Sequence, residues 1–388
     1  MTIPLFIILV GINLWLAYKK QYSKVITIIT LVAILIFMAG AGPDYATENR
    51  SMDYINYERR YNNIENVGLG YNIQFGYTII QKIGSFLGLN FFWFRFVVSA
   101  ICLLALYFLV IRKYTYNANF VLSFYLLYPM IIDSEQLRNF IAMTIVLSSI
   151  SLLGKSSSVY KVIYFGMIGI AGTFHTAFLF YLPLMFVTNK KSSRFAKCVA
   201  VFSLLLMVIM LINNNHLPFS EFIIETVNDR RVTRYLSSST TLGFIMPLAL
   251  TISSIILVFW AKMISDREID IYQSTVLSNS SSNKSVVRMT YENRFVNLVF
   301  WINLLSSFFF PFFIITLQFY RLPRNLLLLN IVSYAIVINK LNKDSLHRIF
   351  FIGSVIFSMI LWLFIDLVVT TSADRVLIPF FLNNYFLN

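Results

Sequence analysis

Asp53, Tyr57 and Tyr61 are the first side chains that could do chemistry, because they recur every four residues. This spacing places them on one face of a helix. Phenol rings stack on sugar faces and carboxylates accept hydrogen bonds from sugar hydroxyls, so this face is a candidate sugar site. The alternative is an amphipathic helix, solvated on the membrane surface. Tyr77, in the segment Gln74-Phe75-Gly76-Tyr77, is a further aromatic candidate for sugar binding.

Arg138 stands at the start of an apolar run and follows the polar segment Asp133-Ser134-Glu135-Gln136. A guanidinium binds phosphate in a bidentate way, and the N-terminus of the helix that follows also favours an anion. Arg138 is therefore a candidate for phosphate recognition or catalysis. The alternative is a salt bridge to Asp133 or Glu135, because a charge at the mouth of a helix bundle is costly unless it is paired or functional.

His175 lies in the middle of the apolar stretch 159–188, beside Thr173, Phe174 and Thr176. About 30 residues are too many for one upright helix and too few for two full spans. We therefore predict two half-length helices that meet at a turn near His175. An imidazole, with its ordinary pKa near 6.5, suits general acid–base work there. The alternative is a histidine that is hydrogen-bonded in the core.

Two more segments hold several arginines. They are Asp229-Arg230-Arg231-Val232-Thr233-Arg234-Tyr235 and Phe319-Tyr320-Arg321-Leu322-Pro323-Arg324. If Arg231, Arg234, Arg321 and Arg324 converge, they would bind a pyrophosphate, with Tyr320 beside them. The alternative for each is pairing with a nearby acid. The sequence has no metal-binding motif and no P-loop, so neither a metal nor another cofactor is expected.

The composition decides what kind of protein positions these groups. Of the 388 residues, 58% are hydrophobic and 12% are charged, whereas a soluble domain carries roughly 25% charged residues. Continuous apolar runs without period-2 alternation favour helices over a membrane barrel. We predict an all-α integral membrane protein, a bundle of about 10–12 spans of which some are half-length. It would form one polytopic domain, 1–388, with outer loops at 43–91 and 213–243, the first containing amphipathic helices, and a flexible cytoplasmic loop at 264–292.

The net charge of +14 predicts orientation. Placing the lysine-rich loops in the cytoplasm makes every alternate loop agree with the positive-inside rule, and both termini then face outward. The whole excess of positive charge lies inside in this topology, so nucleic acid is not an expected partner. The basic residues of the outer loops are almost all arginine, which keeps its charge when partly buried and suits phosphate recognition.

Several short motifs, in order along the chain, resemble the EpsG-like branch of bacterial polysaccharide polymerases of the Wzy type. They are Asp53-xxx-Tyr57-xxx-Tyr61, Phe75-Gly76-Tyr77, Gln136-Leu137-Arg138-Asn139-Phe140-Ile141-Ala142, Phe174-His175-Thr176-Ala177 and Tyr320-Arg321. The resemblance covers roughly residues 44–335. The chain departs from the family pattern in Gln74, where a glutamate is usual, and in Asn139, where a glutamine is common.

The resemblance implies a glycosyltransferase with a GT-C-like fold, in the bacterial cytoplasmic (inner) membrane, with its active site facing outward. It would transfer a growing O-antigen, capsule or exopolysaccharide chain from undecaprenyl pyrophosphate to the non-reducing end of a lipid-linked repeat unit. Its partners would be that lipid-linked oligosaccharide, membrane lipid, and a chain-length regulator and flippase of the same pathway.

On this hypothesis Arg138, Arg231, Arg234, Arg321 and Arg324 bind the pyrophosphate, and His175 or Asp53 deprotonates the acceptor. Two alternatives remain. An O-antigen ligase or another polyprenyl-linked glycosyltransferase would use the same arginines, and a lipid-oligosaccharide flippase would need a polar path through both halves of the membrane.

Overall fold

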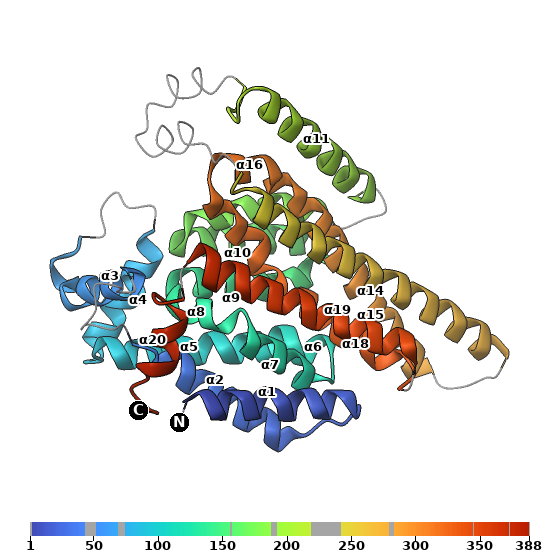
Figure 1. Cartoon of the computed structure of the whole chain (residues 1–388), viewed down its shortest axis with the longest axis horizontal. Helices are drawn as coiled ribbons and strands as arrows, with labels where there is room; N and C mark the ends of the chain where they lie inside the picture. Colours follow the sequence, from blue (N-terminus) through green and yellow to red (C-terminus); the bar gives the residue numbers. More distant parts are fainter. Residues whose placement is uncertain are drawn as a thin grey trace. The chain divides into compact units, whose positions relative to one another are not determined.

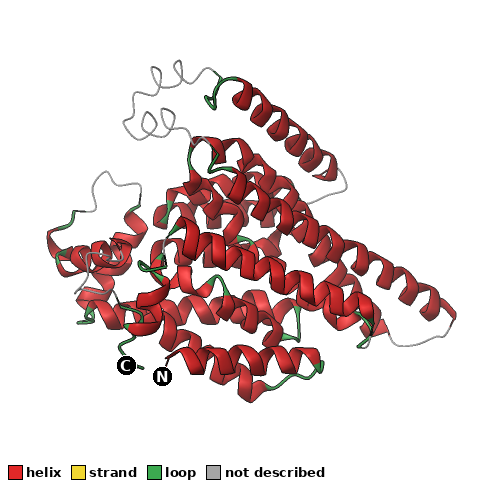
Figure 2. Ribbon diagram, in the orientation of Figure 1, coloured by secondary structure: helices red, strands yellow, loops and turns green. Residues whose placement is uncertain are grey.

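Helices make up most of the part of the chain that the structure describes, and loops and turns join them (Figure 2). This structure, a computed structural model, describes residues 2–42, 52–68, 74–155, 157–187, 192–218, 242–278, 283–343, 345–371 and 373–387. Within these ranges the one β-type contact is an isolated antiparallel bridge between Ala41 and Asn384. The prediction of an all-α protein is confirmed.

The chain divides into two compact units, where the sequence predicts a single domain. Unit 1 comprises Met1–Leu182 and Ile331–Asn388, and unit 2 comprises Pro183–Asn330. The helices of unit 1 are α1 (Thr2–Tyr18), α2 (Lys24–Gly40), α3 (Met52–Asn62), η1 (Ile64–Asn66), α4 (Phe75–Phe86), α5 (Phe91–Leu106), η2 (Tyr107–Ile111), α6 (Arg112–Tyr114), α7 (Ala118–Leu127), α8 (Met130–Glu135), α9 (Leu137–Leu153), α10 (Ser158–Phe174), α19 (Leu346–Leu363), η6 (Phe364–Thr370) and α20 (Leu377–Leu382). Two further helices, η3 (Thr176–Phe186) and α18 (Leu327–Lys340), cross the boundary between the units.

Helix α7 forms the core of unit 1, where it packs against α1 and α2 (Figure 1). All of its residues except Leu127 are buried, as expected for a helix that is apolar on every side. Polar side chains join the three helices inside this core. The Asn119 amide donates to Asn13 Oδ1 at 2.8 Å, and the Asn13 amide donates to Thr30 Oγ1 at 2.8 Å. Hydrogen bonds of this kind hold membrane helices together where burial from water supplies no drive.

The predicted break near His175 is confirmed. Helix α10 ends at Phe174, and after His175 the chain continues as the 3₁₀ helix η3. The Tyr164 hydroxyl donates to the Tyr181 carbonyl at 2.9 Å, which ties the middle of η3 to α10. Gly172 permits this close approach, because a Cβ at that position would lie 2.7 Å from Leu179 Cδ2.

Unit 2 is built around a long antiparallel pair of helices, α14 and α15 (Figure 1). Its helices are α11 (Ser192–Ile212), α14 (Ile245–Ser278), α15 (Asn283–Leu305), η4 (Ser306–Phe309), α16 (Phe310–Ile315), η5 (Leu317–Tyr320) and α17 (Arg321–Asn325). The sequence predicts a flexible loop at 264–292, but α14 continues to Ser278 and α15 begins at Asn283. Of the predicted outer loop 213–243, residues 219–241 lie outside the described part.

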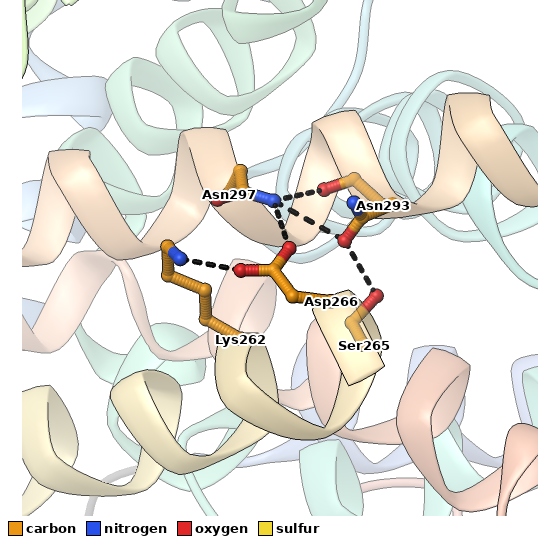
Figure 3. Close-up of polar contacts among 5 residues, drawn as sticks. All are labelled: Lys262, Ser265, Asp266, Asn293 and Asn297. Carbon is orange, nitrogen blue, oxygen red and sulfur yellow. Dashed lines mark hydrogen bonds and ion pairs between the residues drawn. The ribbon is translucent and has the colours of Figure 1, made fainter. Parts of the chain in front are cut away.

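A polar network explains why α14 and α15 continue as helices beyond their apolar parts (Figure 3). Lys262 pairs with Asp266 one turn later on α14, at 2.5 Å. From α15, the Asn297 amide donates to Asp266 Oδ1 at 2.9 Å, and Asn293 Oδ1 accepts from the Ser265 hydroxyl at 2.8 Å. These side chains therefore join α14 to α15 at the two ends of the segment that the sequence predicts to be a flexible loop.

Six helical stretches are long and apolar enough to cross a membrane, and six shorter apolar helices accompany them within the described residues. The long ones are Phe91–Tyr114, Ser193–Ile212, Ile245–Ile271, Val287–Ile315, Leu317–Lys340 and Leu346–Thr370. Large apolar side chains such as Ile7, Val25 and Phe350 are exposed, as lipid-facing residues would be. The chain is an all-α, multi-span membrane protein.

A reciprocal pair of buried amides joins α15 to the end of unit 2. Asn303 donates to Asn330 Oδ1 at 2.7 Å, and Asn330 donates back to Asn303 Oδ1 at 3.0 Å. We expect Asn303→Leu to lower the free energy of unfolding by about 1–2 kcal/mol, because the Asn330 amide then loses its partner. The measurement is a denaturant titration in mixed micelles.

The matched control is the double variant Asn303→Leu/Asn330→Leu. Replacing both partners by apolar groups leaves no orphaned amide, so the double variant should be more stable than either single variant. If the double variant loses as much free energy of unfolding as the two single variants added together, the pairing of Asn303 with Asn330 is contradicted.

Candidate active site

Arg138 is held between three segments of unit 1 by neutral groups. It lies in the first turn of α9. Its Nε donates to the Tyr57 hydroxyl of α3 at 3.2 Å, and its Nη1 donates to Gln74 Oε1, just before α4. The guanidinium carbon lies 5.0 Å from the centroid of the Tyr57 ring and 5.9 Å from that of the Tyr77 ring. Cation–π and hydrogen-bond contacts therefore fix the position of this charge without neutralising it.

The expected alternative, a salt bridge from Arg138 to Asp133 or Glu135, is not formed. Among the described residues Arg138 has no carboxylate within ion-pair distance. Asp133 instead accepts a hydrogen bond from the Tyr125 hydroxyl at 3.1 Å, and Glu135 accepts one from the backbone N–H of Tyr54 at 3.3 Å. No described carboxylate therefore pairs directly with the Arg138 guanidinium.

The pKa of the Glu135 carboxyl is raised from its ordinary value of 4.5 to about 7. Burial is the largest cause, and the nearby Asp53 carboxylate acts in the same direction. Arg95 and the N–H of Tyr54 act in the opposite direction. A carboxylate with a pKa near 7 is poised to gain or lose a proton at neutral pH.

Arg95 lies near the Glu135 carboxylate and joins the surrounding helices. Its guanidinium is buried and donates to the backbone carbonyls of Ala41 (2.7 Å) and Met38 (3.0 Å) at the end of α2, and of Ser134 (3.1 Å) in α8. It also lies 4.5 Å from the centroid of the Tyr54 ring. The last carbonyls of a helix carry partial negative charge, so they stabilise the buried cation. Arg95 therefore joins α2, α3 and α8 around the site.

Tyr61 and Tyr77, which the sequence predicts to bind sugar, are buried in this structure. Tyr61 is buried, donates its hydroxyl to the Leu89 carbonyl at 2.7 Å, and packs on Phe94 with ring centroids 4.8 Å apart. Tyr77 is also buried, and its ring lies 5.6 Å from that of Tyr57. Neither Tyr61 nor Tyr77 has a ring face open for a sugar in this structure. Tyr61 and Tyr77 both pack on Phe94 of α5, and their role in sugar binding stays a prediction.

The Phe75-Gly76-Tyr77 and Phe174-His175-Thr176 motifs meet where α4 packs against α10. A Cβ on Gly76 would lie 2.2 Å from the Thr173 hydroxyl oxygen, so only glycine fits there. His175 follows at the break; its Nδ1 accepts the backbone N–H of Ala177 at 3.3 Å, and its ring is half-buried against Phe178.

The remaining predicted arginines belong to unit 2 or lie outside the described residues. Arg324 in α17 is buried, with its guanidinium carbon 5.5 Å from the centroid of the Tyr320 ring. Arg321 has a buried Nε with no hydrogen-bond partner within the described part of the chain. Arg231 and Arg234 fall in 219–241, outside the described residues. The structure thus brings together Asp53, Tyr57, Tyr77 and Arg138 in unit 1, and Tyr320, Arg321 and Arg324 in unit 2.

A model of the EpsG family matches residues 34–382, nearly the whole chain. The chain belongs to the EpsG family. This is a family of Wzy-like polysaccharide polymerases, so the match supports polymerase function at the family level. No curated protein and no solved structure matches the chain.

Three residues of this candidate site, Glu135, Gln74 and Arg95, are not among those that the sequence predicts for it. From the sequence, Glu135 is expected only as a partner for Arg138, and Gln74 is noted only as a departure from the family pattern. A usable signal for Glu135 was present, because an acid directly after a buried apolar run is costly unless it serves a function.

The contact between Gly76 and Thr173 yields a test of how the two motifs position each other. Gly76→Ala should lower the melting temperature and the amount of folded protein, because the new Cβ overlaps the Thr173 side chain. Adding Thr173→Gly removes the closest atoms and should restore part of the loss. Thermal unfolding in detergent measures both, and a Gly76→Ala protein as stable as the wild type would contradict the packing.

Proposed function

We propose that this EpsG-family protein transfers a growing glycan from undecaprenyl pyrophosphate to the non-reducing end of a lipid-linked repeat unit. The reaction takes place on the outer face of the bacterial cytoplasmic membrane, without a metal ion. The observation that carries the proposal is the fixed Arg138 guanidinium, which has no carboxylate within ion-pair distance among the described residues and interacts electrostatically with Asp53.

In the proposed reaction, an acceptor hydroxyl oxygen attacks the anomeric carbon of the growing chain. The bond from that carbon to the pyrophosphate oxygen breaks, and undecaprenyl pyrophosphate leaves with the electron pair. The hydroxyl proton passes to a base of the protein. Arg138 stabilises the charge that develops on the leaving pyrophosphate, as preorganised donors do in other group transfers.

We assign the role of base to Glu135, in place of His175 or Asp53. Its pKa near 7 lets it accept a proton at neutral pH. In this proposal His175 has a structural position at the helix break, and the charge of Asp53 raises the pKa of Glu135. We propose that Tyr320, Arg321 and Arg324 of unit 2, with Arg231 and Arg234, contribute to binding the lipid-linked substrate.

Arg138→Ala should reduce polymerisation by about 10²–10³-fold, the usual loss when one preorganised donor to a developing negative charge is removed. The measurement is reconstitution with a defined undecaprenyl-pyrophosphate repeat unit, scored for the ladder of chain lengths, with chelator present to test metal independence. Arg59→Ala, which removes an exposed arginine of α3, is the matched control and should keep the ladder. Normal laddering by Arg138→Ala would refute the role of Arg138, and transfer of whole chains to another acceptor without laddering would identify a ligase.

The polymerisation rate should rise about tenfold per pH unit up to about pH 7 and level off above it, because only ionised Glu135 accepts the proton. Glu135→Gln should be slow and independent of pH, whereas His175→Ala and Asp53→Asn should keep a rise. A pH rise that persists in Glu135→Gln and disappears in His175→Ala would assign the base to His175.

Stability gives a second readout for Glu135. The folded pKa lies above the ordinary value of 4.5. The contribution of this carboxyl to stability is therefore fully present below about pH 4.5 and is lost as the pH rises through about 7. Compared with Glu135→Gln, the wild type should lose stability over this interval.

A further inference from the structure

The segment 383–386, which follows α20, is bonded to the end of α2. The backbone N–H of Tyr385 donates to the Gly40 carbonyl at 2.9 Å, and the N–H of Gly42 donates to the Asn383 carbonyl at 2.9 Å. Two parts of unit 1 that are distant in sequence are therefore joined through their backbones.

Two glycines at the end of α2 permit this close approach. A Cβ on Gly40 would lie 2.4 Å from Asn384 Oδ1, and one on Gly42 would lie 2.6 Å from Tyr385 Cε2. Both distances are shorter than van der Waals contact, so a side chain at either position would displace the segment 383–386.

Asn384 and Arg95 divide the carbonyl groups at the end of α2 between them. The last carbonyls of a helix need donors from outside it. The buried Asn384 amide donates to the carbonyls of Ile36 at 3.3 Å and Phe37 at 3.4 Å. The Arg95 guanidinium donates to two others at the same helix end, as described above. Because the amide occupies its own pair of carbonyls, the guanidinium is confined to the remaining pair.

The position of Arg95 affects Glu135. The Arg95 guanidinium also donates to the carbonyl of Ser134, the residue before Glu135, at 3.1 Å. Its charge lowers the pKa of the Glu135 carboxyl, against the larger effect of burial. Three residues of α3 also interact with Glu135, namely Asp53, Tyr54 and Tyr57. Arg95 is thus the link between Glu135 and the end of α2.

We propose that Asn384 is a positioning residue for the candidate active site, and that it confines Arg95 to its place beside Glu135. Without the Asn384 amide, the Ile36 and Phe37 carbonyls lose their donor from outside the helix, which is costly for buried polar groups. A guanidinium has five N–H donors, so Arg95 would be drawn toward these carbonyls and away from Glu135. The inference rests on the proposed role of Glu135 as the base.

The test follows the ionisation of Glu135 in the purified full-length protein. Infrared difference spectroscopy against Glu135→Gln gives the pH midpoint of this carboxyl, and the ladder of chain lengths gives the pH profile of polymerisation. Asn384→Ala should raise the midpoint by about one pH unit, because a cation that favours the ionised form moves away. Polymerisation should then fall about tenfold below the midpoint and keep the wild-type rate above it. A loss of folded protein would instead lower the rate at every pH.

Gly40→Ala is a second variant with the same expected effect, because the new Cβ overlaps the Asn384 amide oxygen. Phe386→Leu is the matched control. It changes a ring that packs on Phe92 and Phe96, with centroids 5.0 and 6.0 Å apart, and it keeps the Asn384 amide. Phe386→Leu should lower the melting temperature without moving the midpoint.

An unchanged midpoint in both Asn384→Ala and Gly40→Ala, or an equal rise in Phe386→Leu, would overturn the positioning role of Asn384. If the midpoint rises in the infrared spectra and the polymerisation profile does not follow it, the positioning role is supported and the role of Glu135 as the base fails.

Discussion

The candidate active site depends on one constraint, which is that the Arg138 guanidinium is fixed by groups that do not cancel its charge. Tyr57, Gln74 and the Tyr77 ring supply hydrogen bonds and π-faces, all neutral, from segments that are distant in sequence. A carboxylate in the place of Gln74 would form an ion pair with Arg138 and compete with an anionic ligand. The departure from the family pattern at Gln74 therefore has a physical consequence, since it leaves more positive charge for a pyrophosphate.

Two other buried arginines of unit 1 show a different way of stabilising the same side chain. Arg95 donates to the last carbonyls of α2, and Arg348 donates to those of Ala17 and Tyr18 at the end of α1, at 3.2 and 2.9 Å. Helix C-termini carry partial negative charge, so these guanidiniums act as structural caps. Arg138 stands at a helix N-terminus, where no such carbonyls are available, and this difference in position separates Arg138 from the two structural arginines.

The sequence alone predicted the helical class and the break at His175, because these follow from apolar length and glycine placement. It did not predict that α14 extends to Ser278 and that α15 begins at Asn283, since pairing of Ser265 with Asn293 and of Asp266 with Asn297 is a tertiary effect. Nor did it predict the enclosure of Tyr61 or the raised pKa of Glu135. Both depend on which neighbours α3 meets, and a four-residue spacing identifies a face without identifying what covers it.

Direct binding tests the central claim, that Arg138 is positioned to hold the pyrophosphate of the lipid-linked substrate. The measurement is the affinity of the purified protein for undecaprenyl pyrophosphate, compared between wild type, Arg138→Ala and Arg59→Ala. The account predicts that Arg138→Ala binds at least about tenfold more weakly while Arg59→Ala binds like the wild type. Equal affinity of Arg138→Ala and the wild type would contradict it.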